Sequence, residues 1–448
     1  IFILEKQRML LKMRLTKLSL IAAMLISSSV FAIENTKVSG NAKLYYGTQD
    51  SDVANTPDMF TKDSGYTNFS ARADLTTDLT KGVSAGIGMQ VVTTLGVEHN
   101  LVDSVWSNAH TASGSNGAAF AGGAQVESAM WVDEVWLAGS AFDTTLKIGR
   151  QALDTPLAFS EKWGVDKNTF EAVVLINQSI KDTTLVGTYI GKSNGSADDR
   201  ASTHEGGAGS LNNLGLAAAG YVAADGDFST FGTNGTYAYG IVNNSIKPLT
   251  VQAWYYDMVR LAKAYWLQAD LDLNGVLAGA QFMNTEADAA SSADTTGYSA
   301  MLGYKMKDVA TFKVAYSSIE DDGLLGVANT ATGSFATKGG QSKLYTEMWW
   351  NYGLVSAAGA DSYSITAETV VGPKIGLLAG FYCADIAPKD VGLTLFEEKE
   401  VTEVTFAATK SFGPLDTALA LIFADTDAAN NVNDVKTTDI QAYLTYNF

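Results

Sequence analysis

The chain has 448 residues, and its 30 Lys and Arg against 48 Asp and Glu give a formal net charge of −18. Charged residues make up only 17% of the sequence, below the roughly 25% of an average soluble protein. The acidic balance excludes nucleic-acid binding, the 10% aromatic content argues against disorder, and a single Cys excludes a disulfide framework or a Cys-rich metal module.

The N-terminal segment has the pattern of a secretory signal. Basic residues at 12, 14 and 17 precede the short apolar run 18–26 (LSLIAAMLI), and small residues lead to a candidate cleavage site after Ala32. The run is shorter than the about 20 apolar residues of a membrane-spanning helix, and a buried core helix is the alternative. We expect residues 1–32, an N-terminal extension plus signal peptide, to be removed. Residues 33–448 then form a single exported domain with 25 basic and 47 acidic residues and a net charge of −22.

Side chains alternate between apolar and polar along the rest of the chain, with the two-residue period of β-strands. The last segment is the clearest, because Ile440 and Phe448 share one face while Gln441 and Thr445 share the other. The pattern predicts 18 strands, near 38–48, 66–79, 83–95, 126–138, 144–151, 169–180, 183–191, 234–243, 249–258, 262–272, 276–284, 297–306, 310–319, 361–371, 375–384, 400–411, 415–425 and 437–448. Sixteen strands are the alternative if one has been split. The stretch 214–224 is assigned to a long loop, because a single-chain bacterial barrel closes with an even number of strands.

Three features favour a membrane barrel over a soluble β-sandwich, which would also alternate. The face opposite the aliphatic side chains is small and polar, which suits a wet interior. Short turns such as 80–82 and 273–275 alternate with long polar loops such as 96–124 and 320–342. Aromatic residues near strand ends are expected to form interface girdles, at 45–46, 254–256, 265–266 and 446–448. We therefore predict an all-β fold, a transmembrane antiparallel β-barrel with an aqueous interior.

One segment breaks the pattern. In 126–138, either choice of face turns one of Asp133 and Glu134 toward lipid. We therefore expect a β-bulge or a rim position there.

Several stretches resemble the OprD-type porins of Gram-negative outer membranes, a family that includes the major-outer-membrane-protein porins. They are GRQALDTPL at 149–157, NTFEAVVLI at 168–176, PLTVQAWYYD at 248–257 and AYWLQADLDLNG at 264–275. The last strand fits as well, because it ends in the aromatic residues Tyr446 and Phe448, the kind of signal that barrel-assembly machinery reads.

The resemblance implies an 18-stranded barrel, often a homotrimer, whose third extracellular loop folds inward to narrow the pore. In this chain that loop is about 152–168. There is one departure from the family, whose channels guide carboxylates along a row of arginines. Residues 33–448 contain only Arg72, Arg150, Arg200 and Arg260, so a long arginine ladder cannot be built and the family's substrate specificity is not carried over.

Fixed charges at the narrowest point of a pore set its selectivity. The candidates that alternation or the constriction loop directs to the lumen are Arg72, Asp74, Arg150, Asp154, Glu161, Asp166, Glu171, Asp270 and Asp272. Acids facing Arg72 and Arg150 would create a transverse field, and the alternative for each residue is a merely solvated wall or loop charge. The total charge of −22 predicts a preference for cations, attenuated by salt.

The leading functional hypothesis is an outer-membrane porin for passive diffusion of small hydrophilic solutes and ions, with outer-membrane lipid as its surroundings. A plugged barrel with a structural or adhesive surface role is the alternative, and a secreted all-β binding module is a third. Catalysis is not expected, because His99, His110 and His204 lie in predicted loops without a motif partner. Acidic loop pairs such as Asp198-Asp199 offer oxygen ligands to Ca²⁺, but none has the spacing of a calcium loop, and we expect no cofactor.

Overall fold

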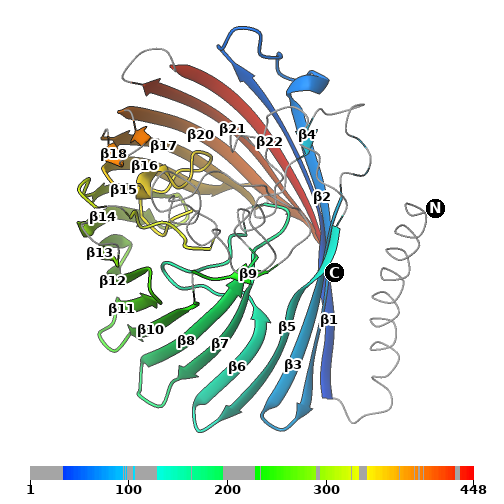
Figure 1. The fold of residues 1–448 in the computed structure, drawn as a ribbon. Helices are drawn as coiled ribbons and strands as arrows, with labels where there is room; N and C mark the ends of the chain where they lie inside the picture. Colours follow the sequence, from blue (N-terminus) through cyan, green and yellow to red (C-terminus); the bar gives the residue numbers. More distant parts are fainter. Residues whose placement is uncertain are drawn as a thin grey trace, which may run out of the picture.

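The chain forms a closed antiparallel β-barrel in a computed structural model (Figure 1). The structure describes residues 34–448 apart from 94, 96, 98–103, 106–128, 163, 195–227, 233, 289–292, 324, 332–340, 373, 388, 392–393, 397 and 429–433. The expected signal segment 1–32, the stretch 214–224 and the three histidines lie outside the described residues. Within the described part, no helix is long and apolar enough to cross a membrane.

Eighteen long strands build the barrel wall. They are β1 (Glu34–Ser51), β2 (Gly65–Thr80), β3 (Val83–Thr93), β5 (Ala129–Ala141), β6 (Thr144–Gln151), β7 (Phe170–Asn177), β8 (Thr183–Ser193), β10 (Thr236–Asn243), β11 (Leu249–Met258), β12 (Ala262–Leu273), β13 (Val276–Ala287), β14 (Thr295–Met306), β15 (Ala310–Ile319), β16 (Ala360–Val371), β17 (Ile375–Ile386), β20 (Lys399–Phe412), β21 (Leu415–Ala428) and β22 (Val435–Asn447). Short strands accompany them at β4 (Ser104–Val105), β9 (Ser229–Thr230), β18 (Lys389–Val391) and β19 (Thr394–Phe396). The predicted 18-stranded barrel is confirmed, and the 16-stranded alternative is excluded.

Each long strand pairs with its neighbour in sequence, and β1 pairs with β22 to close the ring. The closure extends to the C-terminal residue, because Phe448 and Gly40 exchange backbone hydrogen bonds with N···O distances of 2.9 and 3.0 Å. Closure leaves no unpaired strand edge, which is the condition for a sheet to cross hydrocarbon. Both ends of the described chain therefore lie at the same end of the barrel.

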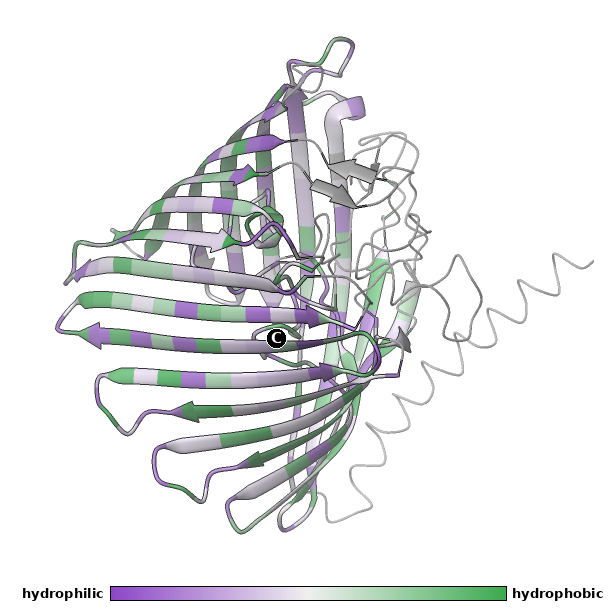
Figure 2. Cartoon of the chain, turned by 60° about the vertical axis from the view of Figure 1, so that its left-hand side comes forward, coloured by the Kyte–Doolittle hydropathy of each residue, from purple (hydrophilic) through white to green (hydrophobic). Residues whose placement is uncertain are grey.

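The strand faces follow the predicted alternation. On β14, Tyr298, Leu302 and Tyr304 are half exposed or more, whereas Ser299 is buried. The exposed apolar side chains point outward and the small polar ones point into the barrel, and Figure 2 shows the resulting alternation of green and pale or purple bands along the strands. This outward apolar face with a polar inner face is the arrangement of an outer-membrane barrel.

The two ends of the barrel differ as the sequence predicts. Short turns of two to five residues connect the strands at one end, where Gly82 and Gly275 have φ of 77° and 91°, the region that glycine adopts at least cost. A Cβ at Gly275 would lie 2.7 Å from the Lys305 carbonyl oxygen. The longer connections leave the strands at the other end, and the described residues of 152–169 and 320–359 turn into the barrel (Figure 1).

The aromatic girdle prediction is correct for only part of the named residues. Outward rings contact one another between strands, with centroids 6.5 Å apart for Tyr239 and Tyr255 and 5.2 Å apart for Tyr255 and Tyr265. Trp254 and Trp266, in contrast, are buried on the inner face. Neighbours in a strand point to opposite faces, so a consecutive aromatic pair can supply only one ring to a girdle.

Candidate functional site

The loop that follows β6, residues 152–169 and here named L3, lies inside the barrel. Its backbone carbonyls at Gly164 and Val165 accept hydrogen bonds from Lys43 Nζ (3.3 Å) on β1 and Ser70 Oγ (2.5 Å) on β2. Its Leu157 amide donates to the Tyr256 hydroxyl on β11 at 3.2 Å. Since β1 and β11 lie nearly opposite each other in the strand order, L3 crosses the interior. The predicted inward-folded third loop is confirmed.

The described residues of a second loop, 320–359 between β15 and β16 and here named L7, also lie inside the barrel, where Figure 1 shows them in yellow. Tyr345 Oη donates to Asp270 on β12 at 2.5 Å, and the Lys343 carbonyl accepts from Gln281 on β13 at 2.8 Å. The sequence analysis treated part of this loop only as a polar connection. The stretch SKLYTEMWWNYGLVS at 342–356 is far richer in aromatic and aliphatic residues than a solvated loop, and that was the signal of its burial.

L3 and L7 bind each other across the interior. The Asn329 side chain of L7 accepts from the Phe159 amide at 3.2 Å and donates to the Phe159 carbonyl at 2.8 Å. Glu161 of L3 accepts from Asn329 Nδ2 at 3.1 Å and from the Gln341 amide at 2.9 Å. Apolar residues of both loops, including Leu157, share one buried cluster with the barrel wall. Together the loops form a partition that narrows the lumen.

The charges on one wall are organised by a β-bulge. Gly88 of β3 pairs with Glu134 and the next residue pairs with Val132, so Asp133 is the extra residue of β5. The bulge turns both acidic side chains inward, where each forms an ion pair with Arg72 of β2. The expectation of a bulge in this segment is confirmed, and it keeps both carboxylates away from lipid.

Arg72 is the centre of this charge cluster. Its side chain is only 9% exposed, and Nη2 lies 2.6 Å from Asp74 Oδ1 and 2.9 Å from Glu134 Oε1. Lys167 of L3 contacts Glu134 as well, and burial together with the nearby Arg72 charge lowers the pKa of Lys167. The predicted inward direction of Arg72 and Asp74 is therefore observed, but their charges bind each other and L3.

The predicted lumen positions of Arg150 and Glu171 are wrong. The two side chains form an ion pair at 2.8 Å on the outward face, in register with the exposed Val135 and on the same side of their strands as Ile148 and Val173. The alternation of Glu171 with the apolar Phe170 and Ala172 predicts a lumen position for Glu171, with Arg150 as a partner in the transverse field. Phe170 and Ala172 are buried on the inner face, where the L3–L7 partition makes the interior dry.

The remaining predicted acids take up distinct positions. Asp270 lies on the inner face and binds Tyr345, and Asp272 shares that face, is exposed and lies nearer the short-turn end. On L3, Asp154 pairs with Lys343 at 2.5 Å, whereas Glu161 and Asp166 are buried. The structure thus brings the L3 acids together with L7 and the wall. Among the described residues, no group of His, Cys, Asp and Glu is placed to hold a metal ion.

L7 is folded around a buried acid of its own. Glu347 accepts from the Gly353 amide at 2.8 Å, the Met348 amide at 3.2 Å, and the amide and hydroxyl of Ser342. Burial raises the pKa of Glu347 to about 7. The shape of L7 therefore depends on a carboxyl that titrates near neutral pH.

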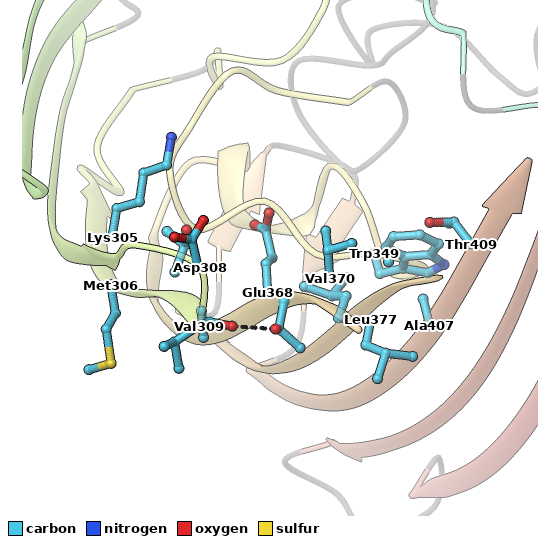
Figure 3. A pocket seen from close by; sticks show the side chains of 15 residues that line it. Lys305, Met306, Asp308, Val309, Trp349, Glu368, Val370, Leu377, Ala407 and Thr409 are labelled. Carbon is cyan, nitrogen blue, oxygen red and sulfur yellow. Dashed lines mark hydrogen bonds between the residues drawn. The ribbon is translucent and has the colours of Figure 1, made fainter. Parts of the chain in front are cut away.

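Beneath L7, toward the short-turn end, lies a cavity of about 810 Å³. Residues of β14–β17, of β20 and of the β14–β15 turn line it, and Trp349 of L7 borders it. Figure 3 shows Trp349 beside Thr409, with Glu368 and Asp308 further along the same wall and Lys305 next to Asp308. This vestibule carries charges of both signs and is open to solvent.

The structure defines the class of fold as an 18-stranded porin-type barrel with two inward loops, and solved structures of this class match it. Acinetobacter baumannii OccAB1 aligns with a TM-score of 0.67 over 93% of this chain and 97% of its own, at 13% identity. Pseudomonas aeruginosa OpdQ aligns with a TM-score of 0.64 over 93% and 98%, at 14% identity. Pseudomonas aeruginosa OpdK, solved with vanillate, aligns with a TM-score of 0.62 over 93% and 100%, at 13% identity.

These neighbours are outer-membrane channels of the OprD family, so the resemblance seen in the sequence is confirmed at the level of the fold. No family model matches the sequence, and no curated protein of similar sequence is found.

Proposed function

We propose that the protein is an outer-membrane channel for passive diffusion of small hydrophilic solutes and ions. The observation that supports it most is a closed barrel with an apolar outer face, a polar inner face and an open vestibule beneath the L3–L7 partition. The structural likeness to OccAB1 and OpdQ supports the same assignment. The proposal includes removal of the signal segment near Ala32, a role of Tyr446 and Phe448 in barrel assembly, and a homotrimer in the membrane.

Single-channel recording in a planar bilayer tests the proposal. Stepwise, ohmic current increments after insertion of the purified protein are the expected result. A bilayer that stays sealed at saturating protein would instead indicate that L3 and L7 plug the barrel, as a structural or adhesive surface protein requires. The trimer is tested separately by the mass of the complex in detergent.

We further propose that the channel prefers cations. The charge of −22 on residues 33–448 concentrates cations at the mouths, and the positive charge of Arg72 is offset by Asp74, Asp133 and Glu134. The sign of the reversal potential in a KCl gradient measures this preference. Cation selectivity that weakens as salt rises is expected, because the screening length falls from about 10 Å at 0.1 M to about 3 Å at 1 M. An anion-selective reversal potential would contradict the charge argument.

A further inference from the structure

Glu403 lies on the inner face of β20, and L7 buries its side chain completely. Its Oε1 accepts from the backbone N–H of Trp349 at 3.0 Å and of Trp350 at 3.1 Å. Its Oε2 accepts from the N–H of Trp350 at 3.1 Å, the N–H of Asn351 at 2.8 Å and the Asn351 side-chain amide at 3.0 Å. The Thr405 hydroxyl completes the set at 2.8 Å. A single wall carboxylate therefore binds three successive peptide groups of the loop.

This arrangement is a strong attachment for a loop. Successive backbone N–H groups that converge on one anion form a nest, and hydrogen bonds to an ionised acceptor are shorter and stronger than those between neutral groups. A fully buried carboxylate also needs several hydrogen-bond donors, because they compensate for the hydration that it has lost. Glu403 and residues 349–351 therefore fix each other's positions through hydrogen bonds, and packing alone does not have to fix them.

The attachment decides how far L7 extends across the barrel. One part of L7 is bound at Asp270 on β12, whereas Glu403 lies on β20, six strands further around the ring. L7 therefore spans the interior as a chord between these two points. At the β20 end, Trp349 and Trp350 pack against the small buried cluster around Ala407, and Trp349 borders the vestibule (Figure 3).

We propose that Glu403 is a positioning residue that holds L7 as a size filter, and that this carboxylate limits which solutes cross the barrel. The inference rests on the proposed channel function. Without the carboxylate, residues 349–351 lose their acceptor, the β20 end of L7 leaves the wall, and the passage beside the vestibule widens. Larger neutral solutes then pass, although no residue that they contact has been replaced.

The test compares Glu403→Ala and Glu403→Gln with the wild-type chain and with Glu400→Ala, which lies on the outward face of the same strand. Each protein is reconstituted in vesicles, and swelling rates are measured for neutral sugars from a pentose to a trisaccharide. Single-channel conductance is recorded in parallel. We expect Glu403→Ala to raise conductance about two-fold and to admit sugars that the wild type excludes, because pore width sets passage of neutral solutes. Glu400→Ala should match the wild type.

The glutamine variant separates shape from charge. Gln has the size of Glu, but one of the two acceptor oxygens becomes an NH₂ group that cannot accept from the N–H donors facing it, so the size limit should rise in the same direction as in the Ala variant. A Glu403→Gln or Glu403→Ala protein that folds and keeps the wild-type sugar limit would overturn the inference.

Where Glu403→Ala fails to assemble, a second variant replaces Trp350 by Pro, which removes the N–H that both Glu403 oxygens accept and leaves the wall intact. That protein should also admit the larger sugars, and an unchanged limit would again overturn the inference. A wild-type protein that passes neither ions nor sugars would contradict the channel function itself, which is a different result from a conducting channel insensitive to Glu403.

Discussion

Replacing Arg72 by Met tests whether the charge cluster at the β5 bulge holds the barrel together. Arg72 binds Asp74, Asp133 and Glu134, and the Arg72 and Asp133 side chains are 9% and 0% exposed. Met keeps most of the volume of the side chain but leaves the carboxylates without their cation. Lys167 is the nearest remaining positive group, and it contacts Glu134 more closely than it approaches Asp133, from which it lies 4.0 Å away.

Breaking a buried ion pair by removing one partner costs about 3–5 kcal/mol, because the remaining charge is dry and uncompensated. Lys167 stays beside Glu134, so we expect Arg72→Met to lower the free energy of unfolding by about 3 kcal/mol, the lower end of that range. The matched control is Arg150→Met. Its ion pair with Glu171 is on the outward face at the long-loop end of β6 and β7, with side chains 30% and 34% exposed, and solvent-exposed pairs at such a rim contribute about 0–1 kcal/mol.

The measurement is unfolding in urea from lipid vesicles, followed by tryptophan fluorescence and by the mobility of the folded barrel in electrophoresis. Arg72→Met should unfold at clearly lower urea than Arg150→Met. Equal losses of unfolding free energy in the two variants would refute the prediction, because they would show that burial does not make the inner cluster more important for stability than the outward pair. Asp133→Asn in the Arg72→Met background should recover part of the loss, because it removes the buried charge left behind.

Two further predictions concern L7 and the barrel seam. The raised pKa of Glu347, about 7 against an ordinary value of 4.5, means that docked L7 binds the proton more tightly than solvated L7. Docking should therefore strengthen as pH falls through about 7 toward 4.5 and weaken as pH rises, by no more than about 3 kcal/mol. Open-channel current noise should be greater at pH 8 than at pH 5, Glu347→Gln should abolish the difference, and greater noise at pH 5 would contradict the assignment. At the seam, a Cβ on Gly40 would lie 2.2 Å from the Arg72 carbonyl oxygen and 2.6 Å from the Phe448 ring, so Gly40→Val should reduce the yield of closed barrel on refolding, whereas Ser39→Val should not.

The strands could be predicted from the sequence because alternation and turn residues are local signals. The β6, β11 and β15 segments start and end at the predicted residues. The turn glycines at 82 and 275 mark the short-turn end, as their positive φ angles require. It was harder to predict which face of each strand points into the barrel, because inward side chains are polar only where the interior contains water.

Glu171 shows the difficulty. Its strand neighbours Phe170 and Ala172 are apolar because they belong to the buried cluster that L3 and L7 share with the wall, and the ring of Phe170 contacts that of Phe231, at a centroid distance of 5.8 Å. No local pattern reports such a contact, and for the same reason neither the folding of L7 into the barrel nor the role of Glu403 was predicted. The aromatic content of 342–356 was the available signal, and it indicates burial without saying where.

Glu403 accepts its hydrogen bonds from main-chain N–H groups, and this affects which substitutions L7 can tolerate. Every amino acid except proline has a backbone N–H, so residues 349–351 can be substituted while L7 stays bound to Glu403. Under the proposed channel function, exchanging the two indoles for other side chains would change the size limit for solutes while the barrel and the attachment of the loop stay the same. A proline at position 350 would cancel one of the donors and mark the limit of that freedom.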